Sequence, residues 1–165
     1  MIDITLSLNG EKIVDRIEDR RTLADFIRNQ QGLTGTHLAC EHGVCGACTL
    51  MMDGKPIRSC ITFAAAMDGA SIQTIEGFDD DKLMAVIRQS FSEDHGLQCG
   101  FCTPGMLITV RDMILRGITR SEAEIRNALA GNLCRCTGYA GIVRAVQSAA
   151  KKCEQMKSSL EASSL

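Results

Sequence analysis

Eight of the nine cysteines fall into two groups of four, and the spacing within each group suits the binding of metal. The first group has the spacing C-x4-C-x2-C-x11-C and comprises Cys40, Cys45, Cys48 and Cys60. This is a spacing found around 2Fe-2S clusters, which are held by four thiolates. The second group has the spacing C-x2-C-x31-C-x-C and comprises Cys99, Cys102, Cys134 and Cys136. Two one-electron centres in one short chain predict a protein that takes up electrons at one centre and passes them on at the other.

The loop that carries the first group is built for close approach to an inorganic core. Gly43, Gly46 and Ala47 have little or no side chain, so the backbone can pass near the sulfides and point its N–H groups at them. Structural zinc is the main alternative, but zinc sites usually consist of two Cys-x2-Cys pairs, and this group has three clustered cysteines and a distant fourth. The first group therefore favours iron and sulfide.

The second group is less specific when taken alone. Its four thiolates fit an iron–sulfur cluster and a zinc site equally well. The pair Cys99 and Cys102 also has the spacing of a redox dithiol, although the strand expected before such a motif in a βαβ unit is not visible. Iron, zinc and dithiol chemistry all remain open for this group on spacing.

The first half of the chain has the pattern of short strands around one helix. Apolar residues alternate with polar ones from Ile4 to Leu8 and lead into Asn9-Gly10, a strong hairpin signal. Helical spacing begins at Thr22 and ends at Gly32. Strands are predicted over 49–52, before an Asp-Gly turn, and over 71–75. A small sheet with a helix packed across it follows from this order.

The second half is predicted to be helical. A helix begins after the acidic run 79–81, and a second begins where the Thr103 hydroxyl is expected to cap the helix before Pro104. Ser121 and Glu124 form a capping box for the third helix. The fourth spans about 141–150, and a polar, Ser-rich tail follows. Four helices are compatible with a small bundle that carries its cysteine pairs in the interhelical loops.

Three stretches of sequence resemble a known family. They are GVCGAC at 43–48, QCGFCTPG at 98–105 and GNLCRCTGY at 131–139. They are similar to the signatures of the small iron–sulfur subunit of molybdenum hydroxylases, the xanthine oxidase family, over roughly residues 3–150. The resemblance implies an α+β chain: a ferredoxin-like β-grasp domain at 1–77, a helical domain with a four-helix bundle at 78–155, and a polar tail at 156–165.

The same resemblance implies the function and the partners. The chain would pass electrons from molybdopterin, in its cytosine dinucleotide form on a large subunit, through two 2Fe-2S clusters to FAD or another acceptor. The FAD would lie on a medium subunit, which makes the complex a heterotrimer. Gln98 would hydrogen-bond the pterin, and Cys136 would both ligate iron and lie at the pterin amino group. The alternative is a freestanding ferredoxin-like electron carrier.

Composition and motifs exclude several other functions. The net charge of −2 argues against nucleic acid and anionic membranes as partners. No secretory signal, twin-arginine leader or long apolar span is visible, so we expect a cytoplasmic protein. No phosphate-binding loop, nucleophile with its base, or paired carboxylates are present either. We therefore predict no catalytic residue on this chain and place substrate chemistry on a partner subunit.

Four residues beside the cysteines have two interpretations each. His42 in the first cysteine loop is interpreted as a loop residue rather than a ligand, since four thiolates already fill the site. Arg58 and Arg135 could offset cluster charge or form surface ion pairs. Tyr139 is interpreted as a packing residue of the helical half, with a hydrogen bond near the second cysteine group as the alternative.

The two complete cysteine groups predict the metal content. Native protein should contain about four irons and about four acid-labile sulfides per chain, because each 2Fe-2S cluster needs four thiolates. Iron and sulfide analysis measures this directly, and electron paramagnetic resonance (EPR) of the reduced protein should show two distinct signals. About two irons, or stoichiometric zinc, would contradict the assignment.

Overall fold

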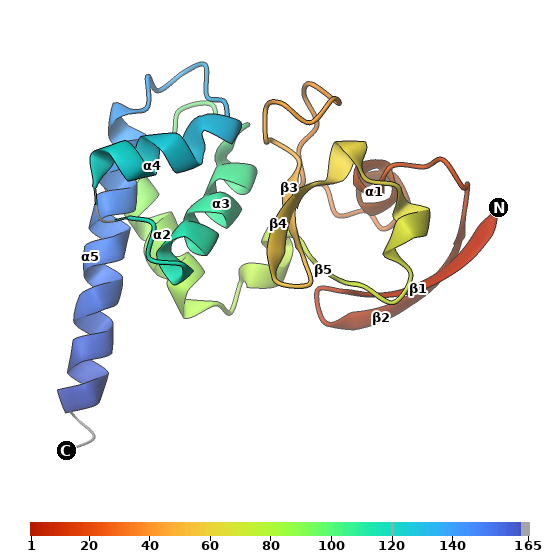
Figure 1. Cartoon of the computed structure of the whole chain (residues 1–165), viewed down its shortest axis with the longest axis horizontal. Coiled ribbons are helices and arrows are strands. Elements are labelled where there is room, and N and C mark those ends of the chain that lie inside the picture. The colour runs from red at the N-terminus through yellow and green to blue at the C-terminus, as the bar shows by residue number, and fades with distance from the viewer. Residues whose placement is uncertain (120, 163–165) are drawn as a thin grey trace.

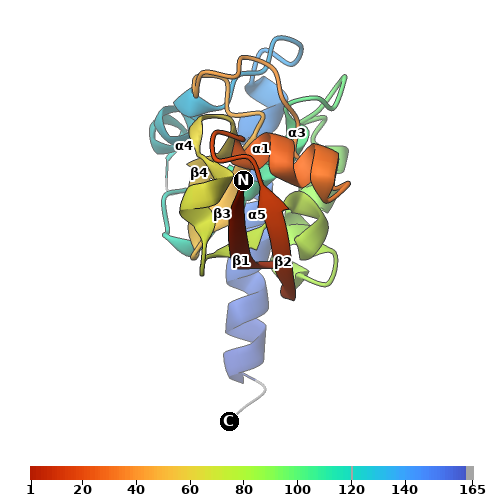
Figure 2. The ribbon, with the colours of Figure 1, turned by 90° about the vertical axis from the view of Figure 1, so that its right-hand side faces the viewer.

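The chain has a small sheet at one end and a group of helices at the other (Figure 1). The computed structural model describes residues 1–119 and 121–162. The N-terminus lies at the far edge of the sheet, and the C-terminal helix extends past the other helices in two perpendicular views (Figures 1 and 2). The α+β class expected from the sequence is confirmed. Within the described ranges, no helix is both long enough and apolar enough to cross a membrane.

The sheet begins with the expected hairpin. Strands β1 (Ile2–Leu8) and β2 (Glu11–Ile17) pair antiparallel, with Leu8 opposite Glu11. Asn9 and Gly10 both adopt positive φ, at 53° and 89°, as a tight primed turn requires. The alternation along β1 buries Ile4, Leu6 and Leu8 on one face.

Three further strands complete a mixed sheet in the order β2-β1-β5-β3-β4. They are β3 (Thr49–Met52), β4 (Lys55–Arg58) and β5 (Ser71–Gln73). β5 runs parallel to β1, and β3 runs antiparallel to both β4 and β5. The expected helix is α1 (Leu23–Asp25), continued by a π-helical turn at Phe26–Gln30. Its buried side chains pack against those of β1, β3 and β5 to form the first core.

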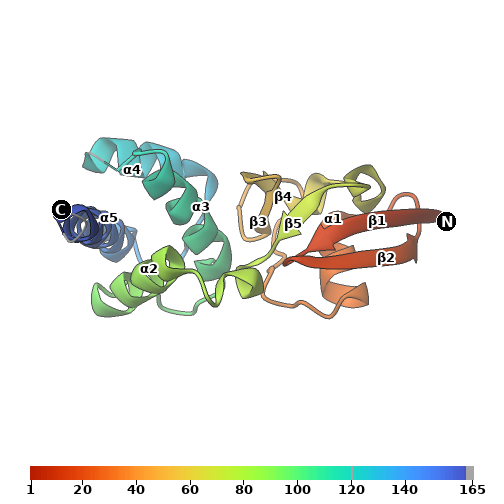
Figure 3. The same cartoon turned by 90° about the horizontal axis from the view of Figure 1, so that it is seen from below.

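The other half consists of α2 (Lys82–Glu93), α3 (Thr103–Leu115), α4 (Glu122–Ala128) and α5 (Ala140–Ala162). Their apolar faces share a second core, which includes Phe91, Met106, Ile125 and Val146. α3 is the helix that lies against the sheet, next to β3 and β4 (Figure 3). This arrangement brings the start of α3 close to the loop that precedes β3.

Strand β3 contributes to both cores. Leu50 is fully buried in the core between sheet and α1, whereas its neighbour Met51 is buried among the helices. Successive side chains of a strand point to opposite faces, so a short strand can serve two layers. The two halves therefore share a packed strand instead of meeting only through a linker.

Two local expectations in the helical half were wrong. α3 begins at Thr103, so Cys102 occupies the capping position, and the Thr103 hydroxyl is buried without a partner among the described residues. The polar segment expected as a tail is helical as far as Ala162. An ion pair of 2.6 Å between Lys152 and Glu93 ties α5 to α2, and the Ser158 hydroxyl donates to the Glu154 carbonyl. The capping box of Ser121 and Glu124 is confirmed.

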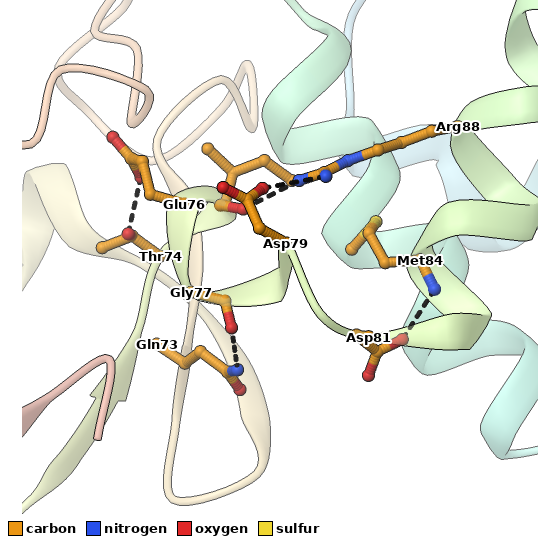
Figure 4. A network of polar contacts seen from close by, with 9 residues as sticks. Gln73, Thr74, Glu76, Gly77, Asp79, Asp81, Met84 and Arg88 are labelled. Atoms are coloured by element: carbon orange, nitrogen blue, oxygen red, sulfur yellow. Dashed lines mark hydrogen bonds and ion pairs between the residues drawn. The ribbon is translucent and has the colours of Figure 1, made fainter.

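A polar network fixes the connection between the sheet and α2 (Figure 4). Arg88 of α2 reaches back and donates to the Asp79 carboxylate at 2.9 Å and to the Ile75 carbonyl at 3.0 Å. Asp81 caps α2 by accepting from the Met84 N–H at 2.6 Å, and it pairs with Arg111 of α3 at 2.6 Å. The connection is thereby held at both of its ends.

Asp81 should stabilise the fold in a pH-dependent way. Burial by itself would raise the pKa of Asp81, but hydrogen bonds from Arg111 and Met84 lower it below its usual value. A depressed folded pKa stabilises the protein above the unfolded-state pKa of about 3.9, and this contribution is lost as the pH falls. Asp81→Ala should therefore lower the free energy of unfolding by about 1–2 kcal/mol at pH 7, and by progressively less below about pH 4.

Chemical denaturation of the wild type and the variant across this pH range measures the difference. Asp80→Ala is the matched control, because Asp80 is the exposed neighbouring carboxylate. Equal effects of the two substitutions, or a difference that grows as the pH falls, would contradict the role of Asp81.

Candidate iron–sulfur site

The first cysteine group is assembled by one loop and one hairpin. Cys40 and Cys45 lie in the loop before β3, and Cys48 directly precedes that strand. The β3–β4 hairpin pairs Thr49 with Arg58, so Cys48 and Cys60 come together at its open end. The Ser59 hydroxyl strengthens this closure by donating to the Cys48 carbonyl at 2.7 Å.

The four thiols of this group lie in two pairs. The side chains of Cys40 and Cys45 contact each other, and the Cys45 N–H also points at the Cys40 sulfur, at 3.3 Å. The Cys60 side chain likewise contacts that of Cys48, and it lies close enough to Cys40 for the charge of Cys40 to raise the Cys60 pKa. All four residues of the first predicted group are therefore brought together.

The second group is assembled from the loops that precede α3 and α5. Cys99 and Cys102 lie in the first loop, and Cys134 and Cys136 lie in the second. The sulfur atoms of Cys99 and Cys136 are 3.5 Å apart, and Cys102 contacts Cys134. The structure thus brings together four residues that are separated by up to 37 positions in the sequence.

Each group presents its thiols as two pairs, and this arrangement fits a 2Fe-2S core. Such a core is bound by four cysteines, two on each iron. A single zinc ion needs all four thiolates around one point. Within the described part of the chain, no three His, Cys, Asp or Glu side chains are arranged to hold one metal ion.

The thiols of the two groups differ in their readiness to ionise. Burial raises the pKa of Cys60 to about 11 and that of Cys102 to about 12. Hydrogen bonds from the backbone of Cys45 and His42 lower the pKa of Cys40 to about 6. Because thiolates are the metal ligands, iron binding at these two groups would have to remove protons from the Cys60 and Cys102 thiols.

The two groups also differ in their exposure to solvent. Cys48 and Cys60 of the first group are buried, at 1% and 6% exposure. Cys99 and Cys136 of the second group are exposed on the surface. Cys40 and Cys45 of the first group, like Cys102 and Cys134 of the second, are half-buried. The first site is therefore more enclosed by the chain than the second, which is open on one side.

The second cysteine loop is held by the Tyr139 side chain. The Tyr139 hydroxyl accepts from the Cys134 N–H at 2.9 Å and donates to the Asn132 carbonyl at 3.0 Å. Tyr139 has a φ of +67°, an uncommon and strained value for a bulky residue. Its ring also packs against the helical core, so both interpretations of this residue are confirmed and its contacts offset the strain.

The remaining residues that the sequence analysis singled out are one histidine, one glutamine and two arginines. His42 contacts the Cys40 carbonyl through Nδ1, which fits a loop residue. Gln98 and Arg135 are exposed. Arg58 makes contacts that the sequence did not predict: it donates to the Thr49 hydroxyl at 2.6 Å and to the Gly131 carbonyl at 2.6 Å, and so joins the two halves of the chain.

Sequence reasoning missed two groups of contacts around the site. The buried Asn132 donates to the Gly46 carbonyl at 3.3 Å. The His37 ring stacks on Phe101 at 4.8 Å between centroids and donates to the Phe101 carbonyl. The only sequence feature that pointed to Asn132 was its position between Gly131 and the second cysteine pair. The contact between His37 and Phe101 could not be predicted, because the two residues are 64 positions apart.

Comparison with known proteins assigns both halves. A family model described as a 2Fe-2S iron–sulfur cluster binding domain matches residues 6–74, and one described as a [2Fe-2S] binding domain matches residues 74–147. Caffeine dehydrogenase subunit gamma of Pseudomonas sp. (strain CBB1) is 47% identical, over 94% of this chain and 95% of its own. The chain belongs to the iron–sulfur subunits of the molybdenum hydroxylase (xanthine oxidase) family.

Other relatives of this iron–sulfur subunit agree. Nicotine 6-hydroxylase small subunit of Paenarthrobacter nicotinovorans is 48% identical, over 88% of this chain and 87% of its own. Quinoline 2-oxidoreductase from Pseudomonas putida 86 has a chain with a TM-score of 0.86 and 43% identity, covering 93% of this chain and 96% of that one. Aldehyde oxidoreductase from Desulfovibrio gigas matches with a TM-score of 0.85 and 35% identity, over 94% of this chain and 18% of that longer chain.

These findings give the iron–sulfur subunit its general role. It is an electron-transfer component of a multi-subunit oxidoreductase, and it contains two 2Fe-2S binding domains. The zinc and dithiol alternatives for the second cysteine group find no support in these matches, and neither does a freestanding carrier.

Tyr139→Phe tests how the second loop is held. The variant keeps the packed ring but leaves the Cys134 N–H and the Asn132 carbonyl without the hydroxyl, which should cost about 1 kcal/mol of stability. Because these groups flank Cys134, the second cluster should be released first, and iron should fall from about four toward about two per chain during mild chelation. Iron analysis and the two EPR signals follow this loss. Simultaneous loss of both signals, or release at the wild-type rate, would contradict the prediction.

Proposed function

We propose that each cysteine group ligates one 2Fe-2S cluster, with the two-plus-two pairing of the thiols as the observation that carries the assignment. Each bound cluster takes up and releases one electron. The ligands are Cys40, Cys45, Cys48 and Cys60 for the first cluster, and Cys99, Cys102, Cys134 and Cys136 for the second. The first group lies in a β-grasp domain over residues 1–77, and the second lies in a four-helix bundle domain over residues 78–155.

The protein contributes ligation, hydrogen bonding and enclosure. The Cys45 N–H points at the Cys40 sulfur, and the Thr137 hydroxyl donates to the Cys134 sulfur at 3.2 Å. A protein adjusts the reduction potential of a cluster through hydrogen bonds to the ligand sulfur atoms and through the degree of solvent exposure. The two sites differ in both, so we propose that they have distinct potentials.

The open side of the second site is proposed to face a large molybdopterin-binding subunit. Leu97, Phe101 and Leu133 are 39%, 46% and 50% exposed, and they belong to the same loops as the exposed Cys99 and Cys136. Apolar side chains gathered at one place on a surface mark interaction sites. Electrons would therefore enter the chain at this side.

Gln98 and Cys136 are proposed to meet the pterin itself, in its cytosine dinucleotide form. The Gln98 side chain is exposed and makes no hydrogen bond with the described residues, which leaves its amide available to a partner. An amide both donates and accepts, which suits the polar edge of a pterin. Cys136 would ligate iron and lie at the pterin amino group.

The first site is proposed to face the electron acceptor, an FAD-binding medium subunit, in a cytoplasmic heterotrimer. Val44, Ile61 and Phe63 are 54%, 62% and 56% exposed. Ile61 lies so close to Gly43 that a Cβ there would be 2.8 Å from Ile61 Cδ1, so these apolar groups border the first ligand loop. We propose no nucleic acid or membrane as a partner of this chain.

Gln98→Ala tests the proposed entry point in the assembled complex. The substitution should leave about four irons per chain. It should slow turnover about tenfold, because a buried polar group of the pterin that loses its partner costs about 1–3 kcal/mol. Gln155→Ala is the matched control on the exposed surface of α5.

Substrate turnover and iron are assayed side by side. Loss of iron in Gln98→Ala would favour a purely structural role for this residue, and unchanged turnover with intact clusters would count against the pterin contact. If the wild-type chain never co-purifies with larger subunits, the freestanding carrier becomes the better description.

A further inference from the structure

The two cysteine loops touch each other directly. The Leu133 N–H, next to Cys134, donates to the Cys45 carbonyl at 2.8 Å. Arg58 reaches from β4 to the Gly131 carbonyl. Next to these contacts, a cavity of about 730 Å³ lies between the two halves, and Arg58, Thr109 and Asn132 are among its lining residues. The packed strand β3 joins the two halves, and between the cysteine loops themselves the direct contact is this small junction.

Two glycines, Gly46 and Gly105, make this junction a contact between backbones. A Cβ at Gly46 would lie 2.3 Å from the Gly131 carbonyl oxygen, and a Cβ at Gly105 would lie 2.2 Å from the Gly46 carbonyl oxygen. Both distances are far below any normal contact, and the obstructing atoms belong to the backbone, which cannot swing aside. The 40–48 loop, the first turn of α3 and the 131–136 loop thus meet at one point.

The Asn132 side chain lies at the centre of this junction, and only 2% of the residue's surface is exposed. Its amide nitrogen donates to the Gly46 carbonyl at 3.3 Å and lies 3.5 Å from the Thr49 hydroxyl. Its amide oxygen accepts from the Thr109 hydroxyl of α3 at 3.0 Å, and it shares this donor with the Gly105 carbonyl, which also lies 3.0 Å away. Its backbone N–H donates to Leu129, and its carbonyl accepts from Tyr139. Every polar group of this buried residue is used.

We propose that Asn132 is a positioning residue for electron exchange within the chain, because its amide sets the distance between the two cysteine groups. The inference rests on the cluster assignment of the proposed function. Asn132 stands two residues before Cys134, and the Gly46 carbonyl lies between Cys45 and Cys48 in the sequence. One rigid side chain therefore bridges the loops of both groups, and a single electron passing from one site to the other crosses a gap that this side chain defines.

Asn132→Ala removes the bridge while leaving all eight proposed ligands in place. In the holo-protein with both sites reduced by dithionite, the magnetic coupling between the two paramagnetic centres depends steeply on their separation. Asn132→Ala should therefore weaken the coupling or spread it into a broad distribution, as seen by low-temperature EPR. Iron should stay at about four per chain. Asn127→Ala is the matched control, because Asn127 is an exposed asparagine of the neighbouring helix α4.

Thr109→Val is a second, milder variant, since it keeps the side-chain shape and removes the hydroxyl that orients the Asn132 amide. It should change the coupling in the same direction, and it decides the question if Asn132→Ala loses iron. Wild-type coupling in an iron-replete variant, with or without a lower melting temperature, would overturn the proposal and leave Asn132 as a stabilising residue. The cluster assignment is judged separately, since it fails only if the wild-type protein lacks four irons and two EPR signals.

Discussion

The structure depends on close approach of backbone to backbone around Gly46. The Gly46 carbonyl oxygen would lie 2.2 Å from a Cβ at Gly105 of α3, and the Gly131 carbonyl oxygen of the second cysteine loop would lie 2.3 Å from a Cβ at Gly46. Contacts between side chains can adjust by changing rotamers, whereas contacts between backbones move only with the loops that carry them. The junction therefore fixes two loops that would otherwise be independent. Its glycines serve this approach, and Gly46 also supplies the positive φ of 74° that its loop requires.

Strand β3 also joins the two halves of the chain, through the hydrophobic interior. Its neighbouring residues Leu50 and Met51 belong to different cores, so disruption of the strand disturbs both. Small domains bury too little surface to be very stable alone. The shared strand gives both halves support that their size does not provide, and a cluster bound at each proposed cysteine group would add to it. The interaction of Arg58 with Gly131 adds a polar contact across the same boundary.

The sequence revealed features that depend on local chemistry. The cysteine spacing, the Asn9-Gly10 turn and the Ser121 capping box are all encoded within a few residues, and each has one dominant structural solution. The residues that join the halves were not predictable in this way. Arg58 and Gly131 are 73 positions apart, and Asn132 and Gly46 are 86 apart, so nothing near either residue indicates its partner. The continuation of α5 was missed for the same reason, since Lys152 is held by Glu93 of another helix.

The contrast between the two sites follows from how the chain folds around them. Cys48 and Cys60 are enclosed because a hairpin and α1 cover them, as their contacts with Ala24 and Leu38 show. Cys99 and Cys136 lie in loops between helices and are exposed, so none of the elements in residues 1–119 and 121–162 covers them. Solvent exposure is among the strongest influences on the potential of an iron–sulfur site. The first site is thus more enclosed by this chain than the second, whose exposed cysteines leave one side open. The exposed cysteines of the second group leave that site accessible to a partner surface, and the rigid junction holds the more enclosed first group at a fixed position beside it.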